Sequence, residues 1–168
     1  HPLYKSNRPD MDDSPQKKEV HVLCKHIKQI LDVMGIYSVY PLSSEGDDII
    51  YHLSETLEGN SVLVSVDQDF YQCVSENCVV YNPQKRLTID LDNFKEVTTV
   101  DLENFVKFKS IKGDPSDNIK GLRGFADKRA KKLVENWEEE SAKLSDEQIQ
   151  TIVDTQKLID LNWKPLTS

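Results

Sequence analysis

The sequence predicts an α/β fold in which a mostly parallel sheet, flanked by helices, is followed by a helical C-terminal module. Residues 61–66 form a nearly continuous apolar run of strand length, the type of segment that a parallel sheet buries. Residues 36–40 alternate and are rich in β-branched and aromatic side chains, which indicates another strand. Segments with helical spacing lie between these strands and dominate the C-terminal half.

Helical periodicity locates a first helix over residues 15–34. A serine-proline pair provides the cap and first-turn signal, and apolar residues then recur every three or four positions until a glycine ends the run. After the strand at residues 36–40, a second helix is expected over residues 45–57. The two helices therefore bracket that strand.

The later elements alternate in the same way. Residues 78–81 and 86–89, separated by Asn-Pro-Gln-Lys, predict a hairpin at the sheet edge. A helix is expected over residues 101–110. A serine cap at position 145 begins another that carries apolar residues on one face to about residue 159.

Acidic residues gather at two of these boundaries. Glu45, Asp47 and Asp48 stand in the first turn of the second predicted helix, where they could complement the helix dipole. Asp67 and Asp69 directly follow the apolar strand, and ligand sites in open α/β sheets lie at the carboxyl ends of strands. Dipole compensation by itself requires no adjacent Asp pair.

Basic residues gather in one later segment. The chain of 168 residues has a net charge of −8, yet residues 107–132 contain nine Lys/Arg and three Asp, a local +6 that leaves −14 elsewhere. A basic module beside an acidic body is what a metal-dependent nuclease needs, because carboxylates hold cations while another surface holds phosphates.

The basic segment is also punctuated by glycines. Asp114 before Pro115 predicts an N-cap and a first helical residue, with Asp117 one turn further on. Gly121 and Gly124 allow tight turns, and the next helix is expected to begin near residue 126. A glycine turn between helices presents N–H groups and cations to a phosphate chain.

This segment resembles the helix-three-turn-helix element of the structure-specific 5′-nucleases, the family of flap endonucleases and of the 5′–3′ exonuclease domain of bacterial DNA polymerase. The family pattern is roughly Gly-Asp-x-x-Asp-Asn-Ile-x-Gly-x-x-Gly-x-Gly-x-Lys. Ala126 departs from it, because the family usually has a third glycine there. The sequence meets the pattern at Gly113, Asp114, Asp117, Asn118, Ile119, Gly121, Gly124 and Lys128.

Three shorter motifs precede it in the family's order. Residues 4–8 resemble Tyr-Lys-x-Asn-Arg, residues 45–48 resemble Glu-x-Asp-Asp with Gly46 in place of the usual alanine, and residues 65–69 resemble Ser-x-Asp-x-Asp. The resemblance implies a PIN-like 5′-nuclease fold. It divides the chain into a metal-binding core at residues 1–106 and a helix-three-turn-helix module with closing helices at residues 107–168.

The resemblance also implies roles for individual residues. Lys5 and Arg8 would face the scissile phosphate. Two Mg²⁺ or Mn²⁺ ions would lie near four acids, with three more completing an outer set, and K⁺ is a further candidate at the glycine turn. The four acids are Glu45, Asp47, Asp48 and Asp67, and the outer three are Asp69, Asp114 and Asp117. The DNA-binding set is Lys120, Gly121, Arg123, Gly124, Lys128, Arg129 and Lys131.

The implied function is a metal-dependent 5′–3′ exonuclease or flap endonuclease, acting as a monomer on flapped, nicked or branched DNA in replication or repair. The alternatives are a non-catalytic module that binds branched DNA and a phosphotransferase-like domain that uses its acids for Mg²⁺. The sequence has no apolar run of membrane length and no signal peptide, which favours a cytoplasmic location. Its three cysteines lack the paired spacing of a zinc site, so they are expected to be reduced thiols. Family members carry another strand and two more acids upstream of the position of His1, so these 168 residues alone are expected to cleave weakly.

Overall fold

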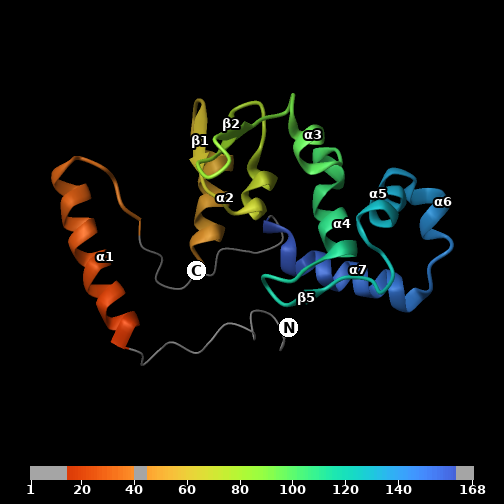
Figure 1. Ribbon diagram of the computed structural model, residues 1–168. Helices are drawn as coiled ribbons and strands as arrows, with labels where there is room; N and C mark the ends of the chain where they lie inside the picture. Colours follow the sequence, from red (N-terminus) through yellow and green to blue (C-terminus); the bar gives the residue numbers. More distant parts are fainter. Residues whose placement is uncertain (1–14, 40–44, 162–168) are drawn as a thin grey trace.

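A computed structural model describes residues 15–39 and 45–161, in which a small sheet lies beside several helices (Figure 1). The helices are α1 (Pro15–Val33), α2 (Gly46–Thr56), the 3₁₀ helix η1 (Gln68–Cys73), α3 (Phe94–Thr98), α4 (Leu102–Lys112), α5 (Asp127–Glu135), α6 (Trp137–Ser141) and α7 (Asp146–Ile159). The strands are β1 (Ser61–Val64), β2 (Cys78–Asn82), β3 (Leu87–Ile89), β4 (Gly113–Asp114) and β5 (Ile119–Lys120).

The larger sheet has the order β1-β2-β3, with β1 parallel to β2 and β2 antiparallel to β3. Alternate residues of β2 (Cys78, Val80 and Asn82) are buried, because successive side chains of a strand point to opposite faces. The Asn82 side chain accepts hydrogen bonds from the backbone N–H groups of Gln84 and Lys85, at 3.1 and 3.0 Å. These bonds close the turn, and the predicted hairpin is confirmed.

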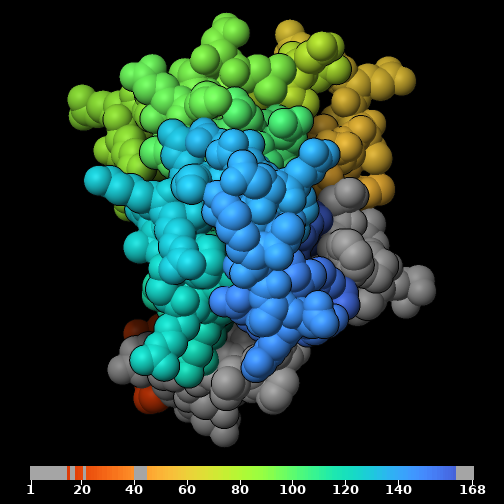
Figure 2. Space-filling model, turned by 90° about the vertical axis from the view of Figure 1, so that its right-hand side faces the viewer, coloured from red at the N-terminus to blue at the C-terminus, as the bar shows by residue number. Residues whose placement is uncertain are grey.

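Helix α4 joins the sheet side of the molecule to the C-terminal helices. Its Phe105 ring packs edge-on against Phe94 of α3, with ring centroids 5.5 Å apart and planes at 85°. Phe108 and Ile111 are buried on the same helix, which also packs against α5 and α7. In the space-filling view the teal-to-blue segments from β4 to α7 cover one face below the green residues of α3 (Figure 2). One apolar core therefore extends from η1 to the end of α7.

Helix α7 is secured at both ends by side-chain hydrogen bonds. At its start, Ser145 Oγ accepts from the Gln148 N–H (3.2 Å) while Gln148 Oε1 accepts from the Ser145 N–H (3.0 Å), which is the predicted serine cap in the form of a capping box. At its end, the Gln72 amide of η1 donates to the Ile159 carbonyl and accepts from the Leu161 N–H, each at 3.0 Å. The C-terminal helix is thereby fastened to the segment that follows β1.

The predicted strand at residues 36–40 is not formed in its described part. Residues 36–39 have no strand pairing, Tyr37 is 92% exposed, and Tyr40 lies outside the described residues. Alternation of side chains indicates a strand only where a neighbouring strand accepts its hydrogen bonds, and the three-stranded sheet does not extend to this segment. Helix α1 occupies the predicted range, with Leu23, Ile27 and Ile30 exposed.

The predicted helix beginning at Asp114 and Pro115 is also wrong. Gly113, with φ of 87°, ends α4, and the chain then forms a tight β4–β5 hairpin through residues 115–118. The Asp114 carboxylate caps this turn by accepting from the Ser116 N–H (3.0 Å), and Asn118 takes the left-handed conformation with φ of 56°. Proline after aspartate suits a turn as well as a helix N-terminus, and here the hairpin is the outcome.

The expected division of the chain between residues 106 and 107 falls inside α4, and residues on both sides of it contribute to the same apolar core. The helices predicted at residues 45–57 and 101–110 are confirmed as α2 and α4. Within the described residues, no helix is both long enough and apolar enough to span a bilayer.

Candidate functional site

The first acidic group lies at the N-terminus of α2. Glu45 is the N-cap residue, and its backbone N–H donates to Asp48 Oδ2 at 3.1 Å. Asp47 and Asp48 stand in the first turn, where carboxylates complement the positive end of the helix dipole. Asp48 Oδ1 is buried without a hydrogen-bond partner among the described residues. One carboxylate oxygen of Asp48 is therefore left without a hydrogen-bond partner in this part of the chain.

The second acidic group follows β1. The Asp67 side chain caps η1 by accepting from the Asp69 N–H at 2.9 Å, and the Asp67 N–H donates to Ser65 Oγ at 3.1 Å. These contacts fix the loop at the carboxyl end of the strand. Asp67 remains exposed, whereas the Asp69 side chain is only 21% exposed. The two carboxylates thus differ in their access to solvent.

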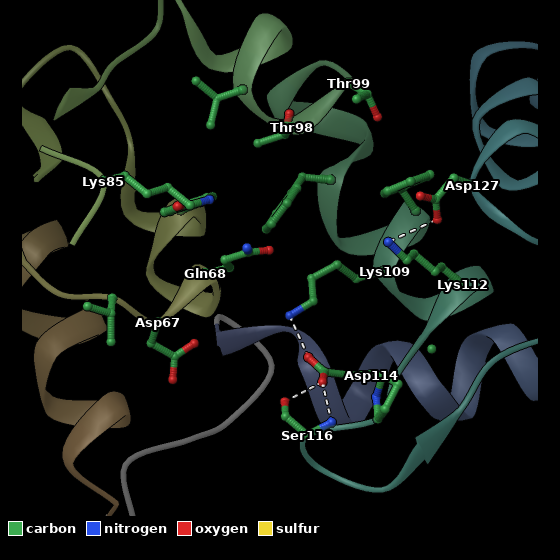
Figure 3. Close-up of a pocket in the computed structure, with 17 residues that line it drawn as sticks. Asp67, Gln68, Lys85, Thr98, Thr99, Lys109, Lys112, Asp114, Ser116 and Asp127 are labelled. Carbon is green, nitrogen blue, oxygen red and sulfur yellow. Dashed lines mark hydrogen bonds and ion pairs between the residues drawn. The ribbon is translucent and has the colours of Figure 1, made fainter. Parts of the chain in front are cut away.

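Lys109 of α4 joins this loop to the β4–β5 hairpin. Its ammonium group donates to Asp69 Oδ1 and to Asp114 Oδ2, the latter at 2.8 Å, and its side chain is 12% exposed. Figure 3 shows Lys109 directed at Asp114, with Asp67 lying across the cavity. Acids from two motifs that are distant in sequence therefore meet at one buried cation.

Electrostatics reinforce this contact. Burial alone would lower the pKa of Lys109, but its two carboxylate partners outweigh burial and raise it. Burial alone would raise the pKa of Asp114, but the hydrogen bonds from Lys109 and Ser116 outweigh burial and lower it. Both groups are therefore charged at neutral pH.

A cavity of about 630 Å³ lies beside the Lys109 cluster (Figure 3). Phe105 and Phe108 of α4 contribute apolar lining, while Gln68, Lys85 and Thr99 contribute polar groups. Its other charged lining residues are Asp67, Lys109, Lys112, Asp114 and Asp127. The cavity thus lies next to Asp67, in the loop that follows β1, and to Asp114 of the β4–β5 hairpin.

The glycine turns lie between β5 and α5. A Cβ at Gly121 would overlap the backbone of Ile111 and Lys112, so this position excludes every other residue type. Gly124 has φ of 83°, which favours glycine. The predicted turn at Gly124 is confirmed, whereas Gly121 lies outside any turn and allows the close backbone approach instead. Helix α5 begins at Asp127, close to the predicted residue 126.

Several cations surround these turns. Arg129 stacks on the Phe125 ring, 4.0 Å from its centroid, while Lys131 lies 3.7 Å from the Glu135 carboxylate. Three exposed cations have no ion-pair partner within the described part of the chain: Lys120, Arg123 and Lys128. These side chains can reach an external anion.

The structure brings together only part of the predicted site. Lys5 and Arg8 lie outside the described residues. Asp117 is buried in the hairpin turn, with 8% of its surface exposed. Over residues 15–39 and 45–161, no three His, Cys, Asp or Glu side chains converge on one metal-sized position. The hard oxygen donors suit a divalent cation, but their arrangement in this part of the chain does not close a coordination sphere.

Sequence reasoning missed Lys109. A signal was present, because Lys109 follows Phe105 by four residues and Phe108 by one, which places a lysine within the apolar stripe of α4. A charged residue at such a position is rarely buried without a partner. Two carboxylates serve that purpose here.

Comparisons with known proteins agree with this architecture. A family model described as 5′-3′ exonuclease, N-terminal resolvase-like domain, matches residues 1–100. A 5′-3′ exonuclease of Mycoplasmopsis pulmonis is 31% identical over 137 residues, covering 80% of this chain and 44% of that protein. The flap endonuclease Xni of Pseudoalteromonas translucida is 31% identical over 123 residues, covering 71% of this chain and 48% of that protein. The chain thus spans less than half the length of these two curated relatives.

Solved structures of a bacteriophage protein share the fold. The 5′-exonuclease of phage T5 with bound zinc matches with a TM-score of 0.69 and 21% identity, covering 96% of this chain and 66% of that one. The phage T5 flap endonuclease in a pseudo-enzyme-product complex with DNA and metal ions matches with a TM-score of 0.72 and 18% identity, covering 95% and 67%. Together with the match over residues 1–100, these findings place the chain in the family of the 5′–3′ exonuclease N-terminal, resolvase-like domain.

Proposed function

We propose that this chain is part of a divalent-metal-dependent nuclease that hydrolyses phosphodiesters near 5′ ends or junctions of DNA, in replication or repair. The observation that carries the proposal is the meeting of Asp69 and Asp114 at Lys109, because it brings the acidic loop after β1 and the hairpin of the glycine element to one place. Relatives named 5′-3′ exonuclease and flap endonuclease support it.

The proposed ion site uses acids from α2 and from the loop after β1. Glu45, Asp47, Asp48 and Asp67 are assigned the positions nearest two Mg²⁺ or Mn²⁺ ions. Asp69, Asp114 and Asp117 form the outer set. Such ions, when bound, neutralise charge on the attacking and leaving oxygens of a phosphodiester. Asp48 Oδ1, which has no hydrogen-bond partner among the described residues, and the exposed Asp67 side chain support the inner assignment.

The proposed substrate contacts come from two further groups of residues. Lys5 and Arg8 are assigned to the scissile phosphate on the sequence motif alone. The cations around the glycine turns grip the duplex backbone without reading base sequence, because they are exposed and lie beside turn amides. With the two glycines that supply turn amides, the proposed DNA-binding set is Lys120, Gly121, Arg123, Gly124, Lys128, Arg129 and Lys131. K⁺ at the turn is a further part of the proposal.

Cleavage of a 5′-flap duplex by the full-length protein tests the function. Cutting is expected with Mg²⁺ or Mn²⁺ and is expected to stop with chelator. Asp67→Asn should lower the rate by about a hundredfold or more, because small displacements of reacting groups already cost that much. Asp92→Asn, an exposed change in the loop before α3, is the matched control. Metal-independent cutting, or full activity after Asp67→Asn, would show that these acids are not the catalytic site.

A binding module that recognises branched DNA without cutting it is the second candidate. The observation in its favour is that, within the described residues, no three acids converge on one ion position. The same flap substrate distinguishes the two candidates. Binding that persists in Mg²⁺ and Mn²⁺ without any cleavage product would establish the second candidate and remove the first.

A further inference from the structure

A buried aromatic ring lies directly beneath one of the cations that follow the Gly124 turn. The Cζ atom of Arg129 is 4.0 Å from the centroid of the Phe125 ring, well within the range of a cation–π contact. Phe125 is 6% exposed and belongs to the apolar core, whereas Arg129 is exposed. The ring therefore offers a fixed platform to a long side chain that lies in solvent.

The backbone holds both partners of this contact in place. The Phe125 N–H donates to the Leu122 carbonyl at 3.1 Å, which closes the turn that carries the ring. The Arg129 N–H donates to the Ala126 carbonyl at 2.9 Å, in the first turn of α5. A long hydrogen bond from Arg129 Nη1 to the Gly124 carbonyl, at 3.5 Å, adds a second contact for the guanidinium. The stacked orientation is thus supported by the ring and by the turn beside it.

A ring holds a cation without cancelling its charge, and this distinguishes Arg129 from other cations of the segment. Lys131 lies 3.7 Å from the Glu135 carboxylate, and Lys112 pairs with Asp127 at 2.9 Å. Arg129 has no carboxylate partner within the described part of the chain. Its five N–H donors lie in one plane, and stacking covers the face of that plane rather than its edge. The charge and most of the donors therefore remain available to a phosphate.

We propose that Phe125 is a positioning residue that holds the Arg129 guanidinium in the orientation in which it binds a phosphate of the DNA backbone. The inference rests on the proposed function and makes Arg129 the pre-oriented contact of this surface. A long side chain loses rotamer freedom when it binds, and a side chain that is already restrained loses less. Among the described residues, no ring lies beneath Lys120, Arg123 or Lys128, so these cations lose more freedom on contact.

Binding of a labelled 5′-flap duplex to the full-length protein, in chelator so that the DNA stays intact, tests the proposal by fluorescence anisotropy. Phe125→Leu keeps an apolar side chain in the core but removes the ring face, and it is expected to weaken binding about two- to tenfold. Arg129→Ala should weaken binding at least as much. In the Arg129→Ala background, Phe125→Leu should have no further effect, whereas a merely structural ring would cost the same factor in both backgrounds.

Phe94→Leu is the matched control, because it removes a buried ring on which, within the described residues, no cation is stacked. It should lower stability and leave duplex binding unchanged. Arg129→Lys decides the question even where Phe125→Leu does not fold, because it keeps the charge on an exposed side chain but replaces the planar guanidinium with a compact ammonium. It is expected to weaken binding about two- to tenfold while the salt slope stays the same.

Wild-type affinity in Arg129→Lys, or equal factors for Phe125→Leu in the two backgrounds, would overturn the proposal. The nuclear magnetic resonance of the Arg129 side-chain protons, recorded without DNA, separates this failure from that of the proposed function. Stacking on Phe125 should shift these protons upfield in the wild type and not in Phe125→Leu, and a wild type without the shift also overturns the proposal. A wild type that shows the shift but binds no duplex contradicts the proposed function, and the role of Phe125 with it.

Discussion

Gly121→Ala is expected to be one of the most destabilising single-methyl additions in the described chain. The backbone passes so close to the C-terminal end of α4 that a Cβ on Gly121 would overlap main-chain atoms of Ile111 and Lys112. Neither neighbour can rotate away, because the three overlapping atoms belong to the helix backbone rather than to a side chain. The hydrogen bond from the Leu122 N–H to the Ile111 carbonyl, at 2.8 Å, holds the two segments at this distance.

The magnitude follows from two contributions. Overpacking of a methyl group costs about 1–3 kcal/mol, and separation of the segments weakens one backbone hydrogen bond worth about 1 kcal/mol. The free energy of unfolding should therefore fall by about 2–4 kcal/mol. For a chain of this size that corresponds to a decrease in Tm of about 4–16 °C.

Urea unfolding followed by circular dichroism measures this change, and two other glycines supply controls. Gly46, in the first turn of α2, has no atom within 4 Å of an added Cβ, so Gly46→Ala should be neutral or stabilising by up to about 1 kcal/mol. Gly124→Ala should cost about 1–2 kcal/mol, because its φ of 83° is unfavourable for alanine while space is available. A Gly121→Ala protein within about 0.5 kcal/mol of wild type would refute the close approach, since surface changes without special contacts have effects of that size.

Thr99→Gly is expected to raise the free energy of unfolding by up to about 1 kcal/mol, because Thr99 has φ of 74°, a conformation that strains a β-branched residue but not glycine. Thermal unfolding measures it. At pH 8 a thiol reagent should label one cysteine rapidly, because Cys24 is exposed whereas burial raises the pKa of Cys73 to about 11 and leaves roughly one thiolate in a thousand. All three cysteines should react after denaturation. Lys120→Ala combined with Lys128→Ala should weaken binding to duplexes of every sequence alike and reduce the salt slope by about 2, as measured by fluorescence anisotropy.

Each of these expectations has an outcome that contradicts it. A less stable Thr99→Gly protein would indicate that the threonine side chain contributes more than its backbone conformation costs. Rapid native labelling of Cys73 would show that η1 opens readily. A binding defect confined to one base sequence would mean that the lysines read bases. Lys95→Ala, in α3 and outside residues 107–132, is the control for general loss of charge.

Much of the secondary structure could be predicted because it depends on neighbours in the sequence. The capping box of Ser145 and Gln148, the turn closed by Asn82 and the left-handed Gly124 are all decided within a few residues of the chain. The family was predicted for the same reason, since its motifs are short and keep their order. The loop of Asp67 after an apolar strand needed only the rule that strand ends carry ligand sites.

Tertiary structure decided the features that depend on a distant partner. Residues 36–39 have strand-like side chains but no pairing strand, and Asp114 forms a hairpin turn where a helix was equally compatible with its sequence. In the sequence, Lys109 is one of nine basic residues in its segment. Only the folded structure shows that it lies between Asp69 and Asp114. Local sequence determines φ, ψ and capping, whereas the pairing of a buried charge depends on which segments the apolar core brings within hydrogen-bond distance.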